Sequence, residues 1–133
     1  MLNDISPLTP GAPSIPVTPV NLPSQKCLFT TTLGAKTTLY TKGQSLRAHF
    51  EHLKKDISIT DMLFTNDTFY LWDSVQKKGI AGHLSENNGI IAIYYNNAIK
   101  QINPQDCQQM DLLYTTFSVP EDISFNTFNN TQQ

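Results

Sequence analysis

Charge is the scarcest property of this 133-residue chain. Only 15% of its residues are Asp, Glu, Lys or Arg, against roughly 25% in an average soluble protein. The basic residues are scattered, and the formal net charge is -2. Nucleic-acid binding needs a concentrated basic surface, so no nucleic-acid partner is expected. The polar but weakly charged composition suits an extracellular protein better than a cytosolic one.

Long apolar runs and targeting segments are also missing. No stretch approaches the roughly 18 apolar residues that a transmembrane helix needs. Met1 is not followed by a basic segment and an apolar run, so no signal peptide is visible. We expect a mature chain with an added start Met, secreted or held at the cell surface. Membrane proximity would then depend on an anchor that is removed or absent.

Motifs of catalysis and metal binding are absent from the sequence. It has no nucleophile elbow, phosphate loop, dinucleotide fingerprint or HExxH pattern. His49 and His52 would share a face only on a helix. Four aspartates lack the spacing of a calcium loop: Asp56, Asp61, Asp67 and Asp73. We therefore predict a non-enzymatic protein with no catalytic residue, metal or cofactor.

Cysteine is limited to Cys27 and Cys107, which bracket most of the expected domain. A bridge across so long a loop would stabilise the fold by roughly 4–5 kcal/mol. Two buried free thiols, common in cytosolic proteins, are the alternative. The residues alone leave both states open.

Proline is abundant only near the start of the chain. Six of the eight prolines lie within residues 7–23. Five of them recur every three residues: Pro7, Pro10, Pro13, Pro16 and Pro19. Polyproline II has three residues per turn, so this spacing predicts an extended arm over residues 1–25. Proline also excludes a helix or a central strand here.

The expected arm is unusually apolar for a linker. Its apolar branched residues include Ile15, Val17, Val20 and Leu22, and its only charge before Lys26 is Asp4. A semi-rigid spacer is one interpretation. The other is a docking arm that lies on a neighbouring protein, including a second copy of the chain.

Residues 26–128 are predicted to form a single β-rich domain, followed by a polar tail over 129–133. Segments rich in Thr, aromatic and branched residues predict strands: 26–33, 36–41, 57–64, 68–72 and 79–84. Tight turns between them favour an antiparallel meander of five to six strands. We expect a curved sheet or half-barrel, mainly β with one helix.

Two segments are ambiguous between helix and strand. In 45–53, a strand would place Leu46, Ala48 and Phe50 inward, whereas a helix would align Leu46 with His49 and Phe50. The short turns on both sides favour the strand. In 90–102, apolar residues recur at helical intervals although many are β-branched. We predict a helix that ends at Asn103-Pro104 and covers one face of the sheet.

Aromatic and apolar strand residues suggest a candidate pocket. Phe50, Leu63 and Trp72 could line the concave face of a curved sheet and bind a small apolar ligand or lipid. Ordinary core packing is the alternative, because strand aromatics are usually core residues.

Short motifs across residues 26–125 carry a resemblance. They comprise a Cys on a strand, a Gly turn, a Leu-Arg-x-x-Phe strand, a Tyr-x-Trp strand end, a second Cys and a closing Phe-x-x-Pro-x-Asp-Ile-x-Phe segment. Here these are Cys27-Leu28-Phe29, Lys42-Gly43, Leu46-Arg47 with Phe50, Tyr70-Leu71-Trp72, Cys107, and Phe117, Pro120, Asp122, Ile123 and Phe125. With its Pro-rich stalk, the chain resembles small extracytoplasmic lipoprotein-like proteins of unknown function from candidate-phyla bacteria. It departs from them at Met110, where Trp is usual.

The resemblance implies an extracytoplasmic home and a Cys27–Cys107 bridge. The expected sheet is also similar, in architecture only, to that of outer-membrane lipoprotein carriers. Our first hypothesis is a non-enzymatic cell-surface domain that acts through protein contacts, as a subunit of an assembly in which the arm docks on a neighbour. The alternative is a carrier of a small apolar ligand or lipid.

Overall fold

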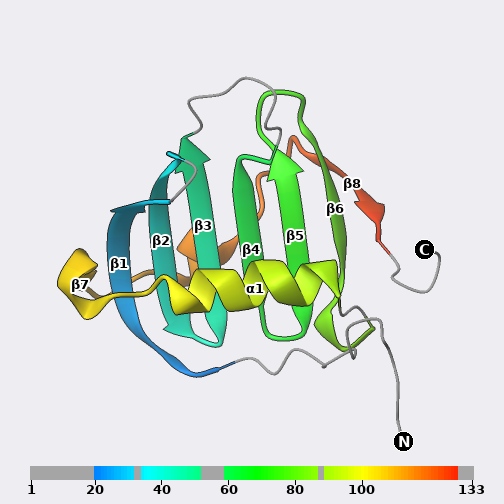
Figure 1. The fold of residues 1–133 in the computed structure, drawn as a ribbon. Helices are drawn as coiled ribbons and strands as arrows, with labels where there is room; N and C mark the ends of the chain where they lie inside the picture. Colours follow the sequence, from blue (N-terminus) through cyan, green and yellow to red (C-terminus); the bar gives the residue numbers. More distant parts are fainter. Residues whose placement is uncertain (1–19, 32–33, 52–58, 87–88, 129–133) are drawn as a thin grey trace, which may run out of the picture.

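A computed structural model describes residues 20–31, 34–51, 59–86 and 89–128. The arm residues Ile15 and Val17 and the expected tail lie outside these ranges. The described residues form eight strands in one curved, unclosed sheet (Figure 1). Along the chain the strands are β1 (Leu22–Thr30), β2 (Lys36–Gly43), β3 (Ser45–Glu51), β4 (Asp61–Thr65), β5 (Thr68–Asp73), β6 (Lys78–His83), β7 (Cys107–Gln109) and β8 (Ser124–Thr127).

The predicted meander is confirmed as strands β1 to β6, which pair in sequence order. Within the ambiguous segment 45–53, Ser45–Glu51 form strand β3, and the short turn at Gly43 makes this possible. Gly43 has a φ of 59°, a conformation that residues with a Cβ seldom adopt. Asn66, with a φ of 53°, has the same role between β4 and β5. All neighbouring strands are antiparallel except β6 and β8.

Strands β7 and β8 extend the sheet beyond the predicted meander. β7 pairs with β1 and β8 pairs in parallel with β6, so they form the two edges. They have only three and four residues, too few for an alternating apolar pattern. Short edge strands leave few unpaired backbone groups for another chain.

Strand β1 begins at Leu22, within the segment expected to be the arm. Pro23 is tolerated because the pairing with β2 shifts register between Leu22 and Gln25, so its missing N–H falls at an irregularity. Just before the strand, the backbone N–H of Val20 donates to the Tyr95 hydroxyl over 3.1 Å. The end of the arm is therefore bound to its own domain.

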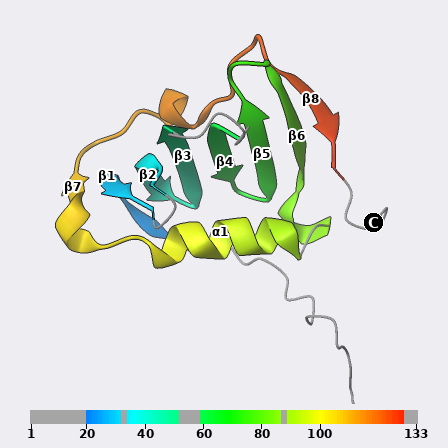
Figure 2. The same ribbon diagram turned by 45° about the horizontal axis from the view of Figure 1, so that its top comes forward.

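Helix α1 (Ile90–Lys100) lies across one face of the sheet (Figures 1 and 2). It confirms the predicted helix and ends before Asn103, whose side chain accepts from Gln105 N–H to begin the short helix η2 (Pro104–Asp106). On the helix, Tyr95 meets the Phe64 ring edge-on at 5.0 Å. The core on this side contains Leu39, Leu46, Ala48, Met62, Phe64, Phe69, Leu71, Leu84, Ile91, Ala92, Tyr95 and Ala98, all buried. Among the described residues, no helix is long and apolar enough to cross a membrane.

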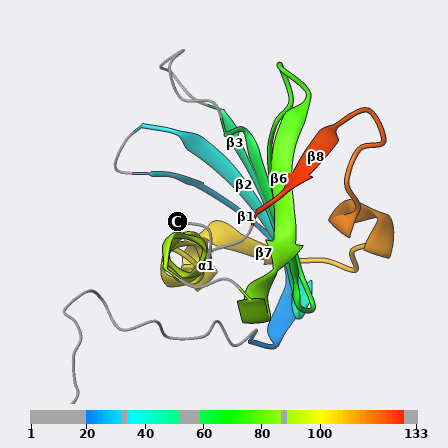
Figure 3. The ribbon, with the colours of Figure 1, turned by 90° about the vertical axis from the view of Figure 1, so that its right-hand side faces the viewer.

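The opposite face, called the outer face below, is partly covered by residues 110–123, called the C-terminal segment. Figure 3 shows this segment and α1 on opposite sides of the sheet. The segment contains the short helix η3 (Tyr114–Phe117), and Phe117 packs against Leu63 and Trp72. Phe125 of β8 contacts Trp72 edge-on at 6.0 Å. Gly79 leaves room for this ring, since a Cβ there would lie 2.8 Å from it.

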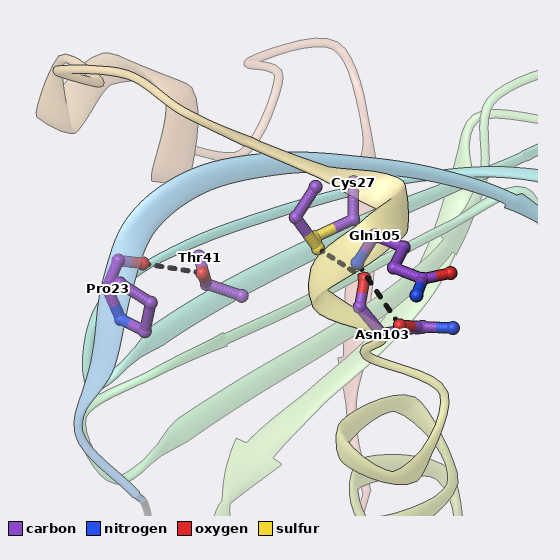
Figure 4. The surroundings of a disulfide bond; sticks show 6 residues. Pro23, Cys27, Thr41, Asn103 and Gln105 are labelled. Carbon is purple, nitrogen blue, oxygen red and sulfur yellow. Dashed lines mark hydrogen bonds between the residues drawn. A yellow bond between two sulfur atoms is a disulfide. The ribbon is translucent and has the colours of Figure 1, made fainter.

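A disulfide joins Cys27 and Cys107 (Figure 4), as the resemblance implied. The two residues are directly opposite each other in β1 and β7. Cys27 is fully buried in the core beneath α1. The bond therefore fastens the edge strand, and the chain that follows the helix, to the centre of the domain.

Candidate functional site

The C-terminal segment crosses one end of β1 and β2, where the Leu112 N–H donates to Ser24 Oγ and Lys42 Nζ donates to the Leu112 carbonyl. Beyond this crossing, the described residues leave the outer face over β1, β2 and β3 only partly covered. The side chains that alternate onto this surface define what we call the open face: Lys26, Leu28, Thr38, Tyr40, Arg47 and His49. Strand register arranges them in two rows, Leu28–Thr38–His49 and Lys26–Tyr40–Arg47. Leu28 is 57% exposed, and Lys26 lies 5.9 Å from the Tyr40 ring centroid.

A buried carboxylate organises the inner edge of the open face. Asp61 of β4 is directly opposite His49 in β3, and its side chain is only 3% exposed. Its Oδ1 atom accepts from His49 Nδ1 at 2.9 Å and lies 3.5 Å from Arg47 Nη2. Its Oδ2 atom accepts from the Thr60 hydroxyl at 2.6 Å. Both oxygens are thus paired, as a buried charge requires.

Arg47 is held from three sides. Its guanidinium lies 5.4 Å from the Trp72 ring centroid, a cation–π arrangement. Nη1 donates to the Thr116 carbonyl of the C-terminal segment at 3.3 Å, while Nη2 lies beside Asp61. The guanidinium therefore has a defined orientation at the boundary between the covered and open parts of the outer face.

A pocket of about 370 Å³ opens at this boundary, lined by Thr38, Tyr40, Arg47, His49 and Thr116. Because His49 donates to the carboxylate through Nδ1, its Nε2 is left for the pocket. Among the described residues, no hydroxyl is hydrogen-bonded to His49, so the chain of hydrogen bonds from Asp61 ends at the imidazole. The arrangement presents hydrogen-bond donors and one aromatic ring to whatever enters.

The three residues of the predicted apolar pocket are not brought together. Leu63 and Trp72 lie on the outer face, each 1% exposed beneath the C-terminal segment. Phe50 packs on the other side of the sheet, with the core under α1. Strand parity explains this, since Phe50 pairs with Thr37 while Leu63 pairs with Arg47.

The other predicted residues lie in separate places. Of the arm residues, Leu22 packs against the core under α1, and Val20 is 40% exposed beside the helix. His52 lies outside the described ranges. In the part of the chain that the structure describes, no cluster of His, Cys, Asp or Glu side chains is placed to hold a metal ion.

Arg47, His49 and Asp61 were not predicted as a site. A signal was present, because alternation places Arg47 and His49 outward on their strand and aligns Asp61 with Leu63 on the next. Only the pairing of β3 with β4 shows that Asp61 is opposite His49. The sequence does not give that register.

No family model, curated protein or solved structure matches this chain. The resemblance to lipoprotein-like proteins therefore stays a prediction. A fold by itself does not indicate a function, so the open face and its pocket are the features from which function can be inferred.

Proposed function

We propose that this chain is a non-enzymatic extracytoplasmic domain that acts through protein–protein contacts, with the open face as its contact surface. One observation carries the proposal: the C-terminal segment packs over Leu63 and Trp72, whereas Leu28 on β1 remains 57% exposed. Tyr40 and Arg47, on the same face, are of the residue types enriched at protein interfaces. A sheet face with this composition, which the described residues cover only in part, fits a partner surface.

The disulfide supports the extracytoplasmic part of the proposal. Disulfides persist in oxidising compartments and are rare in the cytosol. Cys27 and Cys107, the only cysteines of the chain, are bonded to each other. The bridge thus fits a domain that works outside the cytoplasm.

The partner that we propose for the open face is the proline-paced arm of a second copy. An arm in polyproline II form offers proline rings and unpaired carbonyl oxygens, which dock on aromatic surfaces that carry donors. Tyr40 supplies the ring, and Thr38 and Arg47 supply donors. The apolar, nearly uncharged sequence of the arm matches the exposed Leu28.

The point at which the arm joins the domain favours a second copy over the same molecule. Val20 is bonded to Tyr95 of α1, on the side of the sheet opposite the open face. If polyproline II extends over residues 7–19, that stretch spans about 40 Å and resists folding back. An arm of this form, leaving the domain at Val20 on the helix side, would favour contact with another molecule.

Sedimentation velocity over a range of protein concentrations tests the proposal. The arm deletion should remove residues 1–19 and keep Val20, because its N–H is bonded to Tyr95 and β1 begins at Leu22. We expect the full chain to self-associate, and both the deletion and Leu28→Arg to remain monomeric. Val75→Arg is the matched control, since Val75 is 83% exposed in the turn between β5 and β6. Association that survives both the deletion and Leu28→Arg would contradict the proposal.

A further inference from the structure

The pocket on the open face has the size and the donors to bind a small molecule as well as a protein partner. We propose that it binds a small anionic molecule through a carboxylate or phosphate group, held between Arg47, His49 and the hydroxyls of Thr38, Tyr40 and Thr116. The site overlaps the surface proposed for the arm at Thr38, Tyr40 and Arg47, but each of its groups belongs to the domain itself, so the site can be tested in the monomer.

The first support is the preorganisation of the Arg47 guanidinium. Asp61 lies beside Nη2 and also fixes the neighbouring His49 ring through Nδ1. The Trp72 ring and the Thr116 carbonyl hold the guanidinium from the other sides. Donors that are already ordered bind a ligand without the entropy cost of immobilising them. A fixed guanidinium can donate two parallel hydrogen bonds to a pair of carboxylate or phosphate oxygens.

The second support is one buried donor without an acceptor. Arg47 Nε is buried and has no hydrogen-bond partner in the described part of the chain. The hydroxyls of Thr38, Tyr40 and Thr116 line the pocket and are partly exposed, so they can turn toward a ligand. A buried donor without an acceptor is rare and commonly marks the place of a water or an ion. Oxygen-rich anions supply several acceptors at once.

Charge and size define the ligand class. The Asp61 carboxylate is buried and paired with Arg47, and Lys26 lies over the Tyr40 ring on the open side. On the strands of this face, the other charged groups are Lys36 and Lys42 of β2 and Glu51 of β3; Lys42 is paired with Asp111. The pocket is thus weakly basic rather than a basic stripe. Its volume of about 370 Å³ suits a small molecule.

An NMR titration of the full chain tests the anion site. Sodium phosphate and sodium acetate are added separately, at constant pH and ionic strength, and at a protein concentration that sedimentation shows to be monomeric. We expect saturable shifts at His49 and Arg47 with at least one anion. Saturation with phosphate alone or with acetate alone identifies which group the pocket selects.

Three variants make the titration decisive. Arg47→Met should weaken binding by about tenfold or more, because it removes a charge-assisted donor pair. Arg47→Met also leaves the buried Asp61 without its guanidinium partner and could disturb the fold. Thr38→Val is therefore the second variant, because it removes only one hydroxyl. It should weaken anion binding roughly threefold. Lys100→Met removes a charge at the end of α1, away from the pocket, and should leave binding unchanged.

The absence of saturable shifts with both anions would overturn the proposal, as would saturation that Thr38→Val and Arg47→Met leave unaltered. The test is separable from that of the proposed function. Self-association is measured by sedimentation and the anion site in the monomer, so either can fail while the other holds.

Discussion

The two faces of the sheet are covered in different ways. On one, α1 packs along buried apolar residues such as Phe64, and the Cys27–Cys107 disulfide fastens the neighbouring edge strand. On the other, the C-terminal segment packs over Trp72, contacts Arg47 through the Thr116 carbonyl and crosses one end of β1 and β2, so that the open face stays only partly exposed. Both faces come from the same strands by alternation of side chains. One side therefore carries the main core, whereas part of the other stays exposed, and we propose this part as the contact surface.

Loss of the disulfide should give the largest change in stability. A double Cys27→Ala and Cys107→Ala variant removes a cross-link between residues 80 positions apart. Its free energy of unfolding should fall by roughly 4–5 kcal/mol, mainly because the unfolded chain gains freedom. Guanidinium unfolding measures this, and the wild type with a reductant is the control. The reductant should not change the stability of the double variant. If the double variant were as stable as the oxidised wild type, the cross-link would not be the source of this stability.

A matched pair of apolar truncations compares the faces directly. Phe64→Ala should reduce the free energy of unfolding by about 3–4 kcal/mol, because Phe64 is fully buried against Tyr95. Leu28→Ala on the open face should change it by less than about 0.5 kcal/mol. Urea denaturation of both variants provides the measurement. A large loss from Leu28→Ala would mean that the open face is part of the core.

Gly79→Ala tests the covered part of the outer face. A Cβ at Gly79 would lie 2.5 Å from the Leu71 carbonyl oxygen and 2.7 Å from Trp72 Cβ. Relieving this overlap requires a shift of β5 or β6 and should cost about 1–3 kcal/mol. The thermal midpoint should fall accordingly, while self-association and anion binding at the open face are retained. An unchanged midpoint would show that β6 is not packed as described.

The smallest effect is expected for an exposed ion pair at the edge of the outer face. A hydrogen bond from Lys77 to Asp122, 2.9 Å long, lowers the pKa of that carboxyl below its ordinary value of 3.8. The pair therefore adds stability above the unfolded pKa, and this contribution disappears as the pH falls through the folded pKa. Asp122→Asn should be slightly less stable than the wild type at neutral pH and equal to it in strong acid, as measured by urea unfolding. Salt should reduce the difference at neutral pH.

The sequence predicts the meander and helix well, because both follow local periodicity. The sequence does not predict the features that depend on pairing between strands far apart in the chain. β7 and β8 are too short to show a pattern, and they pair with strands far away in the sequence. The site is missed for the same reason: alternation places His49 outward, but only the β3–β4 register places Asp61 opposite it. That register also separates Phe50 from Trp72.

The concentration dependence of the NMR spectrum of the full chain tests the central claim most directly. If the open face receives the arm of a second copy, signals of Leu28, Thr38 and Tyr40 should shift progressively as the protein concentration rises. The exposed face of α1, represented by Ile93, should remain unchanged. Shifts confined to the helix side, or a spectrum that does not depend on concentration, would contradict the account.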